Sequence, residues 1–204
     1  MSQTAIVIPY RDRATHLAEF IQHTDGKLVY VIEQTDGKPF NRAKLLNIGA
    51  QIAFKDGATH IITHDVDMIP VKVDYTPTDC AHLATQCSQF QYRMPYNRYF
   101  GGVNIYSREV FEKVNGYSNN YWGWGAEDDD MLLRCENAGV KIERRNCIFE
   151  SLAHKSNLEP LTHQSNCEYL RSGYDYSKDG LNTLDYSIVL EHDAGTHRII
   201  TVDI

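Results

Sequence analysis

The first 64 residues alternate short apolar runs with stretches that have the spacing of amphipathic helices. The apolar runs 4–9, 28–33 and 60–64 have the length of buried strands, and residues 15–23 and 41–55 carry apolar side chains at helical spacing. A strand–helix–strand–helix–strand order is typical of a parallel sheet with right-handed crossovers. The sequence therefore predicts an α/β fold with a central, mainly parallel sheet, flanking helices and long loops over one edge.

The second half of the chain is less regular, and its 204 residues fit a single domain. We expect mostly irregular structure over residues 150–185. The other expected elements are a strand at 104–107, a short helix at 108–115, a glycine- and aromatic-rich loop at 117–125, a helix at 127–137 and a last strand at 198–202.

Charge and composition exclude some classes of protein. A formal net charge of −7 argues against a nucleic-acid-binding protein, which usually carries a basic face. No stretch reaches the roughly 18 apolar residues of a membrane span, and no targeting segment is evident. The five cysteines form no tight C-x-x-C pair and resemble neither a disulfide framework nor a zinc site. We expect a cytoplasmic protein, with a catalytic domain cut from a secretory-pathway enzyme as the alternative, and we predict no oligomeric state.

An Asp-x-Asp motif, Asp65-Val66-Asp67, follows the third predicted strand. In open parallel sheets ligands bind outside the carboxyl ends of the strands, and carboxylate oxygens suit Mg²⁺ or Mn²⁺. Such a cation can neutralise the charge that develops on a diphosphate leaving group. The alternative is that these acids only cap a loop.

A second motif places two tryptophans between glycines and then four acids, in residues 120–130 (NYWGWGAEDDD). Large aromatic side chains between flexible glycines suggest a lid that closes over a substrate. One of the acids that follow could act as a general base on a hydroxyl group. The alternative is that the acids only favour the amino end of a helix through its dipole.

Basic and aromatic residues follow the first two predicted strands. Pro9-Tyr10-Arg11-Asp12-Arg13 follows the first strand, and Phe40-Asn41-Arg42 opens the second helix, both at the edge where the Asp-x-Asp motif is expected. Arginines and a helix amino terminus there would attract phosphates, although surface ion pairs explain any single arginine. Residues 96–103 place aromatics before a Gly-Gly pair that permits close approach of a ligand, or that forms only a turn.

Read together, these segments resemble the β-1,4-galactosyltransferase family. The similarity is carried by residues 40–49 (FNRAKLLNIG), 65–70 (DVDMIP), 99–103 (YFGGV), 120–130, and the tail segments 179–184 (DGLNTL) and 200–203 (ITVD). It implies a GT-A fold, Mn²⁺ as cofactor with Mg²⁺ possible, and inverting transfer of galactose from UDP-galactose to a sugar hydroxyl in β-1,4 linkage. It also divides the single domain into a nucleotide-binding half, 1–70, and an acceptor-binding half with the lid, 71–204.

The resemblance implies a role for individual residues. Asp128 would be the catalytic base, and Asp67 and His154 would bind the metal. The residues implied for the nucleotide sugar are Pro9, Tyr10, Arg11, Arg13, Phe40, Asn41, Arg42, Asp65, Val66, Tyr99, Gly102 and Trp124. The residues implied for the acceptor are Tyr96, Ala126, Glu127, Asp128 and Asp129.

Departures from the family pattern leave alternatives open. Ser151 stands where methionine is usual, which puts its role as a metal ligand and the metal preference in question, because a serine oxygen is harder than a thioether. The acceptor is open between GlcNAc, xylose, glucose, other glycans and a lipid-linked sugar, and the donor between UDP-galactose and UDP-GalNAc. Two other classes are carried as rivals: a glycoside hydrolase, and a catalytically impaired module that binds UDP or carbohydrate.

Overall fold

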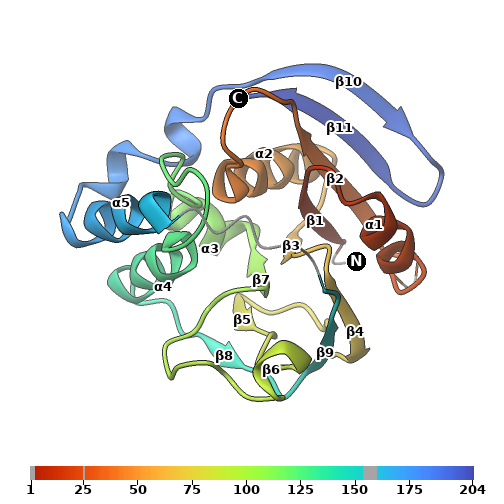
Figure 1. Cartoon of the computed structure of the whole chain (residues 1–204), viewed down its shortest axis with the longest axis horizontal. Coiled ribbons are helices and arrows are strands. Elements are labelled where there is room, and N and C mark those ends of the chain that lie inside the picture. The colour runs from red at the N-terminus through yellow and green to blue at the C-terminus, as the bar shows by residue number, and fades with distance from the viewer. Residues whose placement is uncertain (1–2, 25, 154–159) are drawn as a thin grey trace.

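The structure, a computed structural model, describes residues 3–24, 26–153 and 160–204 (Figure 1). Its helices are α1 (Ala14–Ile21), α2 (Arg42–Lys55), α3 (Arg108–Lys113), α4 (Glu127–Asn137) and α5 (Pro160–Arg171), with short 3-10 turns η1 (Ser88–Phe90), η2 (Tyr176–Lys178) and η3 (Leu181–Thr183). Its strands are β1 (Thr4–Tyr10), β2 (Leu28–Gln34), β3 (His60–His64), β4 (Met68–Lys72), β5 (Cys80–His82), β6 (Gln86–Cys87), β7 (Val103–Ser107), β8 (Glu143–Arg144), β9 (Ile148–Ser151), β10 (Ser187–Asp193) and β11 (Arg198–Asp203).

The large sheet has eight strands in the order β10-β11-β2-β1-β3-β7-β5-β8. The four strands β11, β2, β1 and β3 run parallel to one another, with Val7 opposite Tyr30 on β2 and opposite Thr63 on β3. Strand β7 runs antiparallel to both β3 and β5, and β10 is antiparallel to β11. The predicted α/β fold and its parallel strand–helix core are confirmed, and the complete sheet is mixed.

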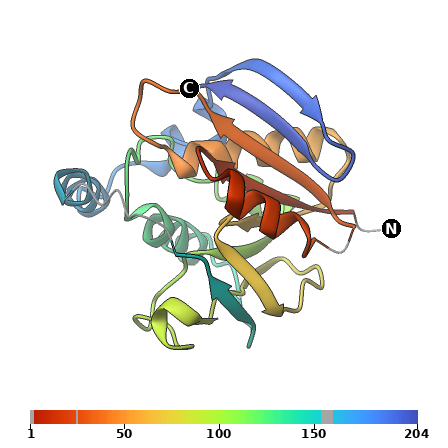
Figure 2. The same ribbon diagram turned by 45° about the vertical axis from the view of Figure 1, so that its right-hand side comes forward.

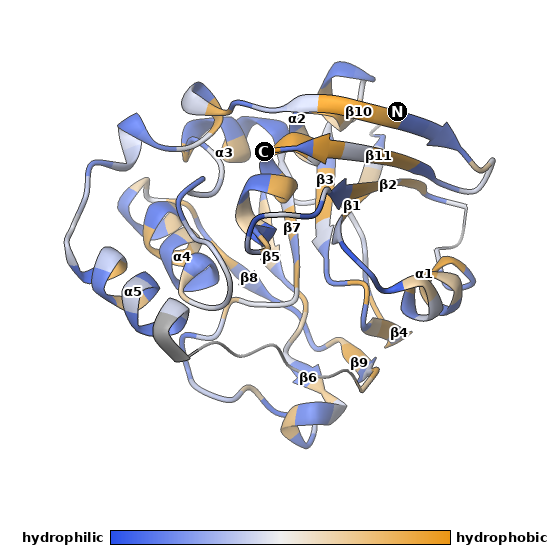
Figure 3. Cartoon of the chain, turned by 45° about the horizontal axis from the view of Figure 1, so that its top comes forward, coloured by the Kyte–Doolittle hydropathy of each residue, from blue (hydrophilic) through white to orange (hydrophobic). Residues whose placement is uncertain are grey.

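Both faces of the large sheet are covered, which explains the unbroken apolar runs of its central strands. On β1, Ala5 and Val7 belong to the same buried cluster as apolar residues of α2, α3 and α4. The alternate residues Ile6 and Ile8 pack with α1 and with the small sheet. Figure 3 shows hydrophobic colour along β2 and β11, and also on the edge strand β10, where residues 188–190 are exposed.

A small sheet of three strands, β4-β9-β6, lies beside the large one (Figure 1). Strands β4 and β9 are antiparallel, with Met68 opposite Ser151. The backbone N–H of Leu152 donates a 2.7 Å hydrogen bond to the carbonyl of Asp67. This pairing brings the turn after β3 next to the end of β9, which lies more than 80 residues later in the chain.

The prediction of mostly irregular structure over residues 150–185 is wrong for Pro160–Arg171, which form α5. This helix lies at the periphery of the molecule, away from the large sheet (Figures 1 and 2). It therefore needs no broad apolar stripe, and the usual pattern that reveals a helix is missing. Strand β10 was missed for a related reason, since all seven of its residues are exposed and show no alternation of buried and exposed positions.

Among the described residues, no helix combines the length and the apolar character that crossing a bilayer requires. The cytoplasmic location expected from the sequence stays a prediction.

Candidate active site

Arg42 gathers three carboxylates at one edge of the large sheet. Its Nε lies 2.6 Å from Oδ1 of Asp65, and its Nη1 lies 2.7 Å from Oδ1 of Asp128. Nη1 also lies 3.6 Å from Oε1 of Glu127, and Nη2 donates a 3.5 Å hydrogen bond to the carbonyl of Gly102. One guanidinium therefore faces three carboxylates, which leaves the cluster with more negative than positive charge when the acids are ionised. Such a cluster can attract a cation or accept a proton from a hydroxyl group.

Three element ends converge to build this cluster. Asn41 caps α2 by accepting a 2.8 Å hydrogen bond from the N–H of Lys44, which makes Arg42 the first residue of the helix. Asp65 comes directly after β3, and Glu127 is the first residue of α4. Acids in the first turn of a helix are favoured by its dipole, so the interpretation of the acidic run as a helix start is also correct.

Burial controls the protonation of Asp128. The removal of water from its surroundings raises the pKa of Asp128 well above the usual range, although the positive charge of Arg42 opposes this, and Glu127 and Asp65 raise it further. Burial likewise raises the pKa of Glu127. The Asp128 side chain is still 21% exposed, so a substrate can reach it. A carboxylate with a raised pKa is a stronger base, as general-base catalysis requires.

A Gly-Gly pair forms the floor below Asp128. A Cβ atom on Gly101 would lie 2.8 Å from Oδ2 of Asp128 and 2.8 Å from the hydroxyl oxygen of Tyr99, so both groups pass over the same Cα. Gly102 has a φ of +83°, a conformation that favours glycine. The groups that approach this pair closely are the protein's own side chains, those of Tyr99 and Asp128. Close approach of a ligand to the Gly-Gly pair stays a prediction.

The residues expected on the acceptor side lie around the start of α4. The hydroxyl of Tyr96 donates a 3.0 Å hydrogen bond to Oδ1 of Asp129. Ala126 has a left-handed backbone with a φ of +74°, which turns the chain from the lid into the helix. The last acid of the run, Asp130, instead pairs with the buried Arg134 at 2.8 Å, so it stabilises the fold.

Two of the expected metal ligands lie on neighbouring segments of backbone. Asp67 lies in the turn between β3 and β4, so it does not share a strand pleat with Asp65. Ser151 pairs with Met68, the residue after Asp67, and its buried Oγ has no hydrogen-bond partner among the described residues. Carboxylate and hydroxyl oxygens both suit a hard divalent cation. His154 lies outside the described residues, and within the described ones no three His, Cys, Asp or Glu side chains gather as a metal site.

The residues expected to hold the nucleotide are only partly brought together. The guanidinium of Arg11 lies 5.4 Å from the centre of the Phe40 ring and donates a 2.9 Å hydrogen bond to the carbonyl of Lys38. Arg13 immediately precedes α1. Arg42 contacts the three carboxylates described above. Four more of the residues expected to bind the nucleotide sugar are buried: Pro9, Tyr10, Asn41 and Val66.

The predicted loop with Trp122 and Trp124 is confirmed, and it is fastened to α5. Nδ2 of Asn166, a buried residue of α5, lies 3.1 Å, 3.2 Å and 3.0 Å from the carbonyls of Trp122, Trp124 and Gly125. The Trp124 side chain is 52% exposed, and its ring centre lies 4.8 Å from that of His163. The sequence did not reveal Asn166, because a single amide in a helix that was itself missed carries no pattern.

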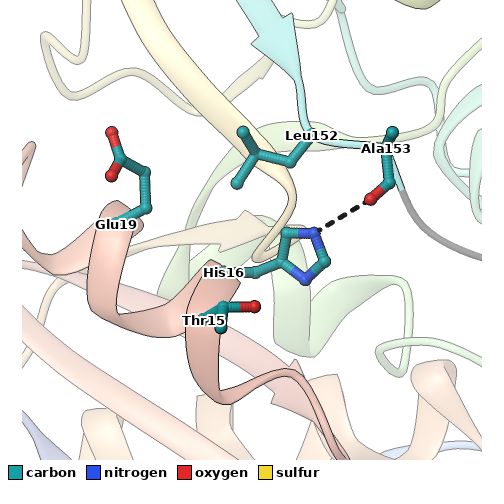
Figure 4. Close-up of a pocket in the computed structure, with 5 residues that line it drawn as sticks. All are labelled: Thr15, His16, Glu19, Leu152 and Ala153. Atoms are coloured by element: carbon teal, nitrogen blue, oxygen red, sulfur yellow. Dashed lines mark hydrogen bonds between the residues drawn. The ribbon is translucent and has the colours of Figure 1, made fainter.

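Two cavities lie beside segments of the candidate site. One, of about 310 Å³, lies between α1 and the segment after β9, where Nε2 of His16 is 3.3 Å from the carbonyl oxygen of Ala153 (Figure 4). The other, of about 410 Å³, lies between the lid and α5. The second is lined by Asn120, Trp122, Thr162, Ser165, Asn166 and Tyr169. The first borders the segment that leads to His154, and the second borders the lid.

Comparison with known proteins places the chain in a family. Residues 1–81 match the N-terminal region of glycosyl transferase group 7, and residues 81–157 match the N-terminal domain of galactosyltransferase. Over 220 residues the chain is 37% identical to β-1,4-galactosyltransferase 4 of Homo sapiens, an alignment that covers 100% of this chain and 64% of that protein. The chain belongs to the β-1,4-galactosyltransferase family.

Further members of the family are similar over the same extent. β-1,4-Galactosyltransferase 5 of Mus musculus is 37% identical over 222 residues, which cover 99% of this chain and 56% of that protein. The chain thus spans about 56–64% of the length of these relatives. A crystal structure of a mutant Drosophila β-1,4-galactosyltransferase 7, in complex with manganese, UDP-Gal and xylobiose, matches with a TM-score of 0.86 at 27% identity, covering 100% of this chain and 94% of that one. This match confirms the predicted GT-A-type fold.

In this family member, the structure brings Asp65, Glu127 and Asp128 together around Arg42 and places Tyr99 beside Asp128. The individual roles that the resemblance assigns to these residues stay predictions.

Proposed function

We propose that this chain is an inverting, Mn²⁺-dependent glycosyltransferase that moves galactose from UDP-galactose to a sugar hydroxyl, forming a β-1,4 linkage. The observation that carries the proposal is Asp128, a carboxylate with a raised pKa that is held between Arg42 and the Gly101 floor and remains open to a substrate. Such a group can take a proton from an attacking hydroxyl. The location of this enzyme in the cytoplasm is a separate proposal, which rests on the sequence.

The reaction would proceed as a single in-line displacement. Arg11, Arg13 and Phe40, which lie at the carboxyl ends of β1 and β2, would hold the UDP part of the donor. The acceptor hydroxyl would lie at Asp128, which removes its proton as the oxygen attacks the anomeric carbon from the face opposite UDP. The positive charge of Arg42 favours the ionised form of Asp128, which is the form that acts as a base, and so opposes the effect of burial.

Asp67, Ser151 and His154 would hold the metal. When it is bound, the metal stabilises the negative charge that develops on the departing diphosphate. The fit rests on the buried Oγ of Ser151, which has no hydrogen-bond partner within residues 3–24, 26–153 and 160–204, and on the pairing of Ser151 with the residue after Asp67. Because a serine oxygen is a hard ligand, Mg²⁺ is a second candidate for this site.

The lid would exclude water from the donor. Trp124 is exposed in a loop whose backbone carbonyls are held by Asn166 of α5, and the N–H of Gly123 in the same loop donates a 2.7 Å hydrogen bond to the carbonyl of Phe40. The exposed indole precedes Glu127 by three residues in the chain, and its flat face could cover a sugar ring. Exclusion of water limits hydrolysis of the donor.

The names of relatives and neighbours support the proposed substrates. Members of the family are named β-1,4-galactosyltransferases, and the Drosophila structure contains UDP-Gal, manganese and xylobiose. These names support UDP-galactose as donor and a sugar such as xylose as acceptor, and GlcNAc is the acceptor that the family resemblance adds. UDP-GalNAc as donor, and glucose, other glycans or lipid-linked sugars as acceptors, are the alternatives that the same site would accommodate.

A matrix of donors and acceptors tests the proposal. UDP-galactose and UDP-GalNAc would each be incubated with Mn²⁺ and with GlcNAc, xylose, glucose or no acceptor, and product linkages would be determined by NMR. We expect a β-1,4-linked galactoside with at least one acceptor. Cleavage of a glycoside without any nucleotide would support a glycoside hydrolase instead, and Mn²⁺-dependent UDP binding without any product would support a binding module.

A further inference from the structure

The turn that forms the floor of the site, Tyr99–Gly102, is held from below by two residues of other elements. His82 is the last residue of β5, and Arg144 is the last residue of β8. The two strands are parallel neighbours, and the two residues are partners in their register. Neither residue appeared among the candidates derived from the sequence. Both side chains contact the turn directly.

The hydrogen bonds fix the tautomer of His82. Nη1 of Arg144 lies 2.8 Å from Nδ1 of His82, and since a guanidinium only donates, Nδ1 must accept. The proton of the neutral ring is therefore on Nε2, which lies 3.1 Å from the carbonyl of Gly101 and donates to it. The ring is fully buried, and burial together with the charge of Arg144 lowers the pKa of His82 to about 4. The ring stays neutral near pH 7.

The same guanidinium holds the start of the turn. Nη1 of Arg144 donates a second hydrogen bond, of 2.7 Å, to the carbonyl of Tyr99. The ring of His82 packs edge-on against the ring of Tyr99, with 5.5 Å between the centres and an interplanar angle of 78°. The carbonyls of Tyr99 and Gly101, two residues apart, are thus both tied to one Arg–His pair.

The upper side of the turn contacts the reacting groups. The carbonyl of Gly102 accepts hydrogen bonds from the N–H of Asp65, at 3.2 Å, and from Arg42, at 3.5 Å. Asp128 and the Tyr99 hydroxyl pass over Gly101 so closely that no Cβ would fit. A shift of this turn would therefore displace Asp128 or Tyr99.

We propose that His82 and Arg144 are positioning residues for sugar transfer. They hold the Tyr99–Gly102 turn in the position that places Asp128 and Tyr99 correctly for the substrate. The inference rests on the proposed function, because it assigns these residues to the same site. Arg144 acts on the reacting groups only through the turn. The binding of UDP at the ends of β1 and β2 does not depend on it.

The test compares Arg144→Gln with Arg145→Gln, a matched control. The neighbouring Arg145 donates to the carbonyls of Asp74 and Thr76 and pairs with Glu143, away from the turn. We expect Arg144→Gln to lower kcat by on the order of 10-fold to 100-fold, the loss that a displacement near 1 Å causes, with unchanged UDP affinity in the presence of Mn²⁺. Arg145→Gln should keep the wild-type kcat.

A second pair of variants separates positioning from folding. His82→Gln keeps an N–H donor for the carbonyl of Gly101 and should retain a larger part of kcat than His82→Leu, which has no donor. Equal losses in both variants, or losses that only follow a lower melting temperature, would contradict the proposal. Wild-type kcat in Arg144→Gln would contradict it as well. If the wild-type protein transfers no sugar at all, the proposed function fails instead.

The hydrogen bonds from His82 and Arg144 to the turn can be observed without an activity assay. In ¹⁵N NMR spectra we expect His82 to remain the neutral Nε2–H tautomer at about pH 5.5, where an exposed histidine is already protonated. In Arg144→Gln the resonances of His82, Tyr99 and Gly101 should shift, whereas Arg145→Gln should leave them in place. Titration of His82 near pH 6.5, or unshifted resonances in Arg144→Gln, would overturn the assignment.

Discussion

Nη1 of Arg42 and Oδ1 of Asp128 lie 2.7 Å apart, so the first residue of α2 is joined directly to the first turn of α4. The family resemblance implies that Arg42 contacts the nucleotide, which stays a prediction. In the structure its guanidinium contacts carboxylates of both halves of the chain. This pairing makes Arg42 the residue that balances the charge of the candidate base.

Removing Arg42 should therefore destabilise the fold. Arg42→Met would leave Asp65, Glu127 and Asp128 without their cation, and breaking a largely buried ion pair usually costs about 3–5 kcal/mol. Because these side chains remain partly exposed to water, we expect about 2–3 kcal/mol, measured as the free energy of unfolding in urea. Arg108→Met, which breaks an exposed pair with Glu112, should change the same quantity by less than about 1 kcal/mol. Equal effects of the two variants would contradict a central role for Arg42.

Asp128→Asn tests the base directly. An amide cannot take the proton of the acceptor, so we expect kcat to fall by a factor on the order of 10² to 10⁴, while UDP binding with Mn²⁺ is retained. Burial raises the pKa of Asp128, which means that the ionised form is disfavoured in the fold. The melting temperature of Asp128→Asn at pH 7 should therefore be equal to that of the wild type or higher. A variant with near-normal turnover would exclude Asp128 as the base.

The dependence of activity on pH follows from the same carboxyl group. A raised pKa means that Asp128 keeps its proton to a higher pH than an ordinary aspartate, and only the ionised form is a base. We expect kcat to rise with pH through a limb that lies above the usual range of aspartate, about pH 4. Single-turnover rates across the acid range would measure this limb. A rate that is flat down to pH 4 would argue against a desolvated base.

The sequence predicted the longer elements that are buried, but not the short strands β4, β5, β6 and β9, which also contain buried residues. Strands β1, β2 and β3 are covered on both faces, so their apolar runs were easy to recognise, and α4 was predicted with its correct ends from its acids and its final glycine. Helix α5 and strand β10 were missed because they contribute little to the core, and the periodicity of apolar residues reveals only elements that do.

The candidate site was predicted as a set of residues, but its contacts were not. The family resemblance assigned Asp65 and Glu127 to the substrate-binding residues of one site. It could not show that Arg42 faces carboxylates, because that depends on where α4 lies relative to α2. His82 and Asn166 escaped notice because a buried histidine and a helical asparagine are ordinary residues until their partners are known.

Metal dependence tests the role of Ser151. Chelation with EDTA should abolish transfer and Mn²⁺ should restore it, since the charge on the leaving diphosphate would otherwise be unbalanced. The Oγ of Ser151 is buried without a partner among the described residues, so we expect Ser151→Ala to weaken Mn²⁺ binding by roughly 10-fold, as measured by electron paramagnetic resonance of free Mn²⁺. Ser172→Ala, at an exposed residue directly after α5, is the control. Undiminished Mn²⁺ affinity in Ser151→Ala would remove the serine from the ligand set.

The contact of Asn166 with the lid predicts that a larger share of the donor is hydrolysed when this contact is lost. Its Nδ2 donates to the backbone carbonyls of Trp122, Trp124 and Gly125, and an aspartate at this position would present only acceptor oxygens to them. Asn166→Asp should therefore release the lid from α5 and admit water to the donor. We expect the ratio of UDP-galactose hydrolysis to transfer to rise by roughly 3-fold to 10-fold, because closure of the lid is what excludes water.

The matched control for this prediction is Gln164→Glu, which makes the same chemical change on the exposed side of α5, where Gln164 contacts only Glu168 among the interactions described. Free galactose and the galactoside would be quantified in one reaction, so that a loss of folded enzyme lowers both and leaves their ratio unchanged. An unaltered ratio in Asn166→Asp would show that the hydrogen bonds to α5 do not control the lid. A higher ratio in both variants would trace the effect to the added charge, because the two substitutions share only that change.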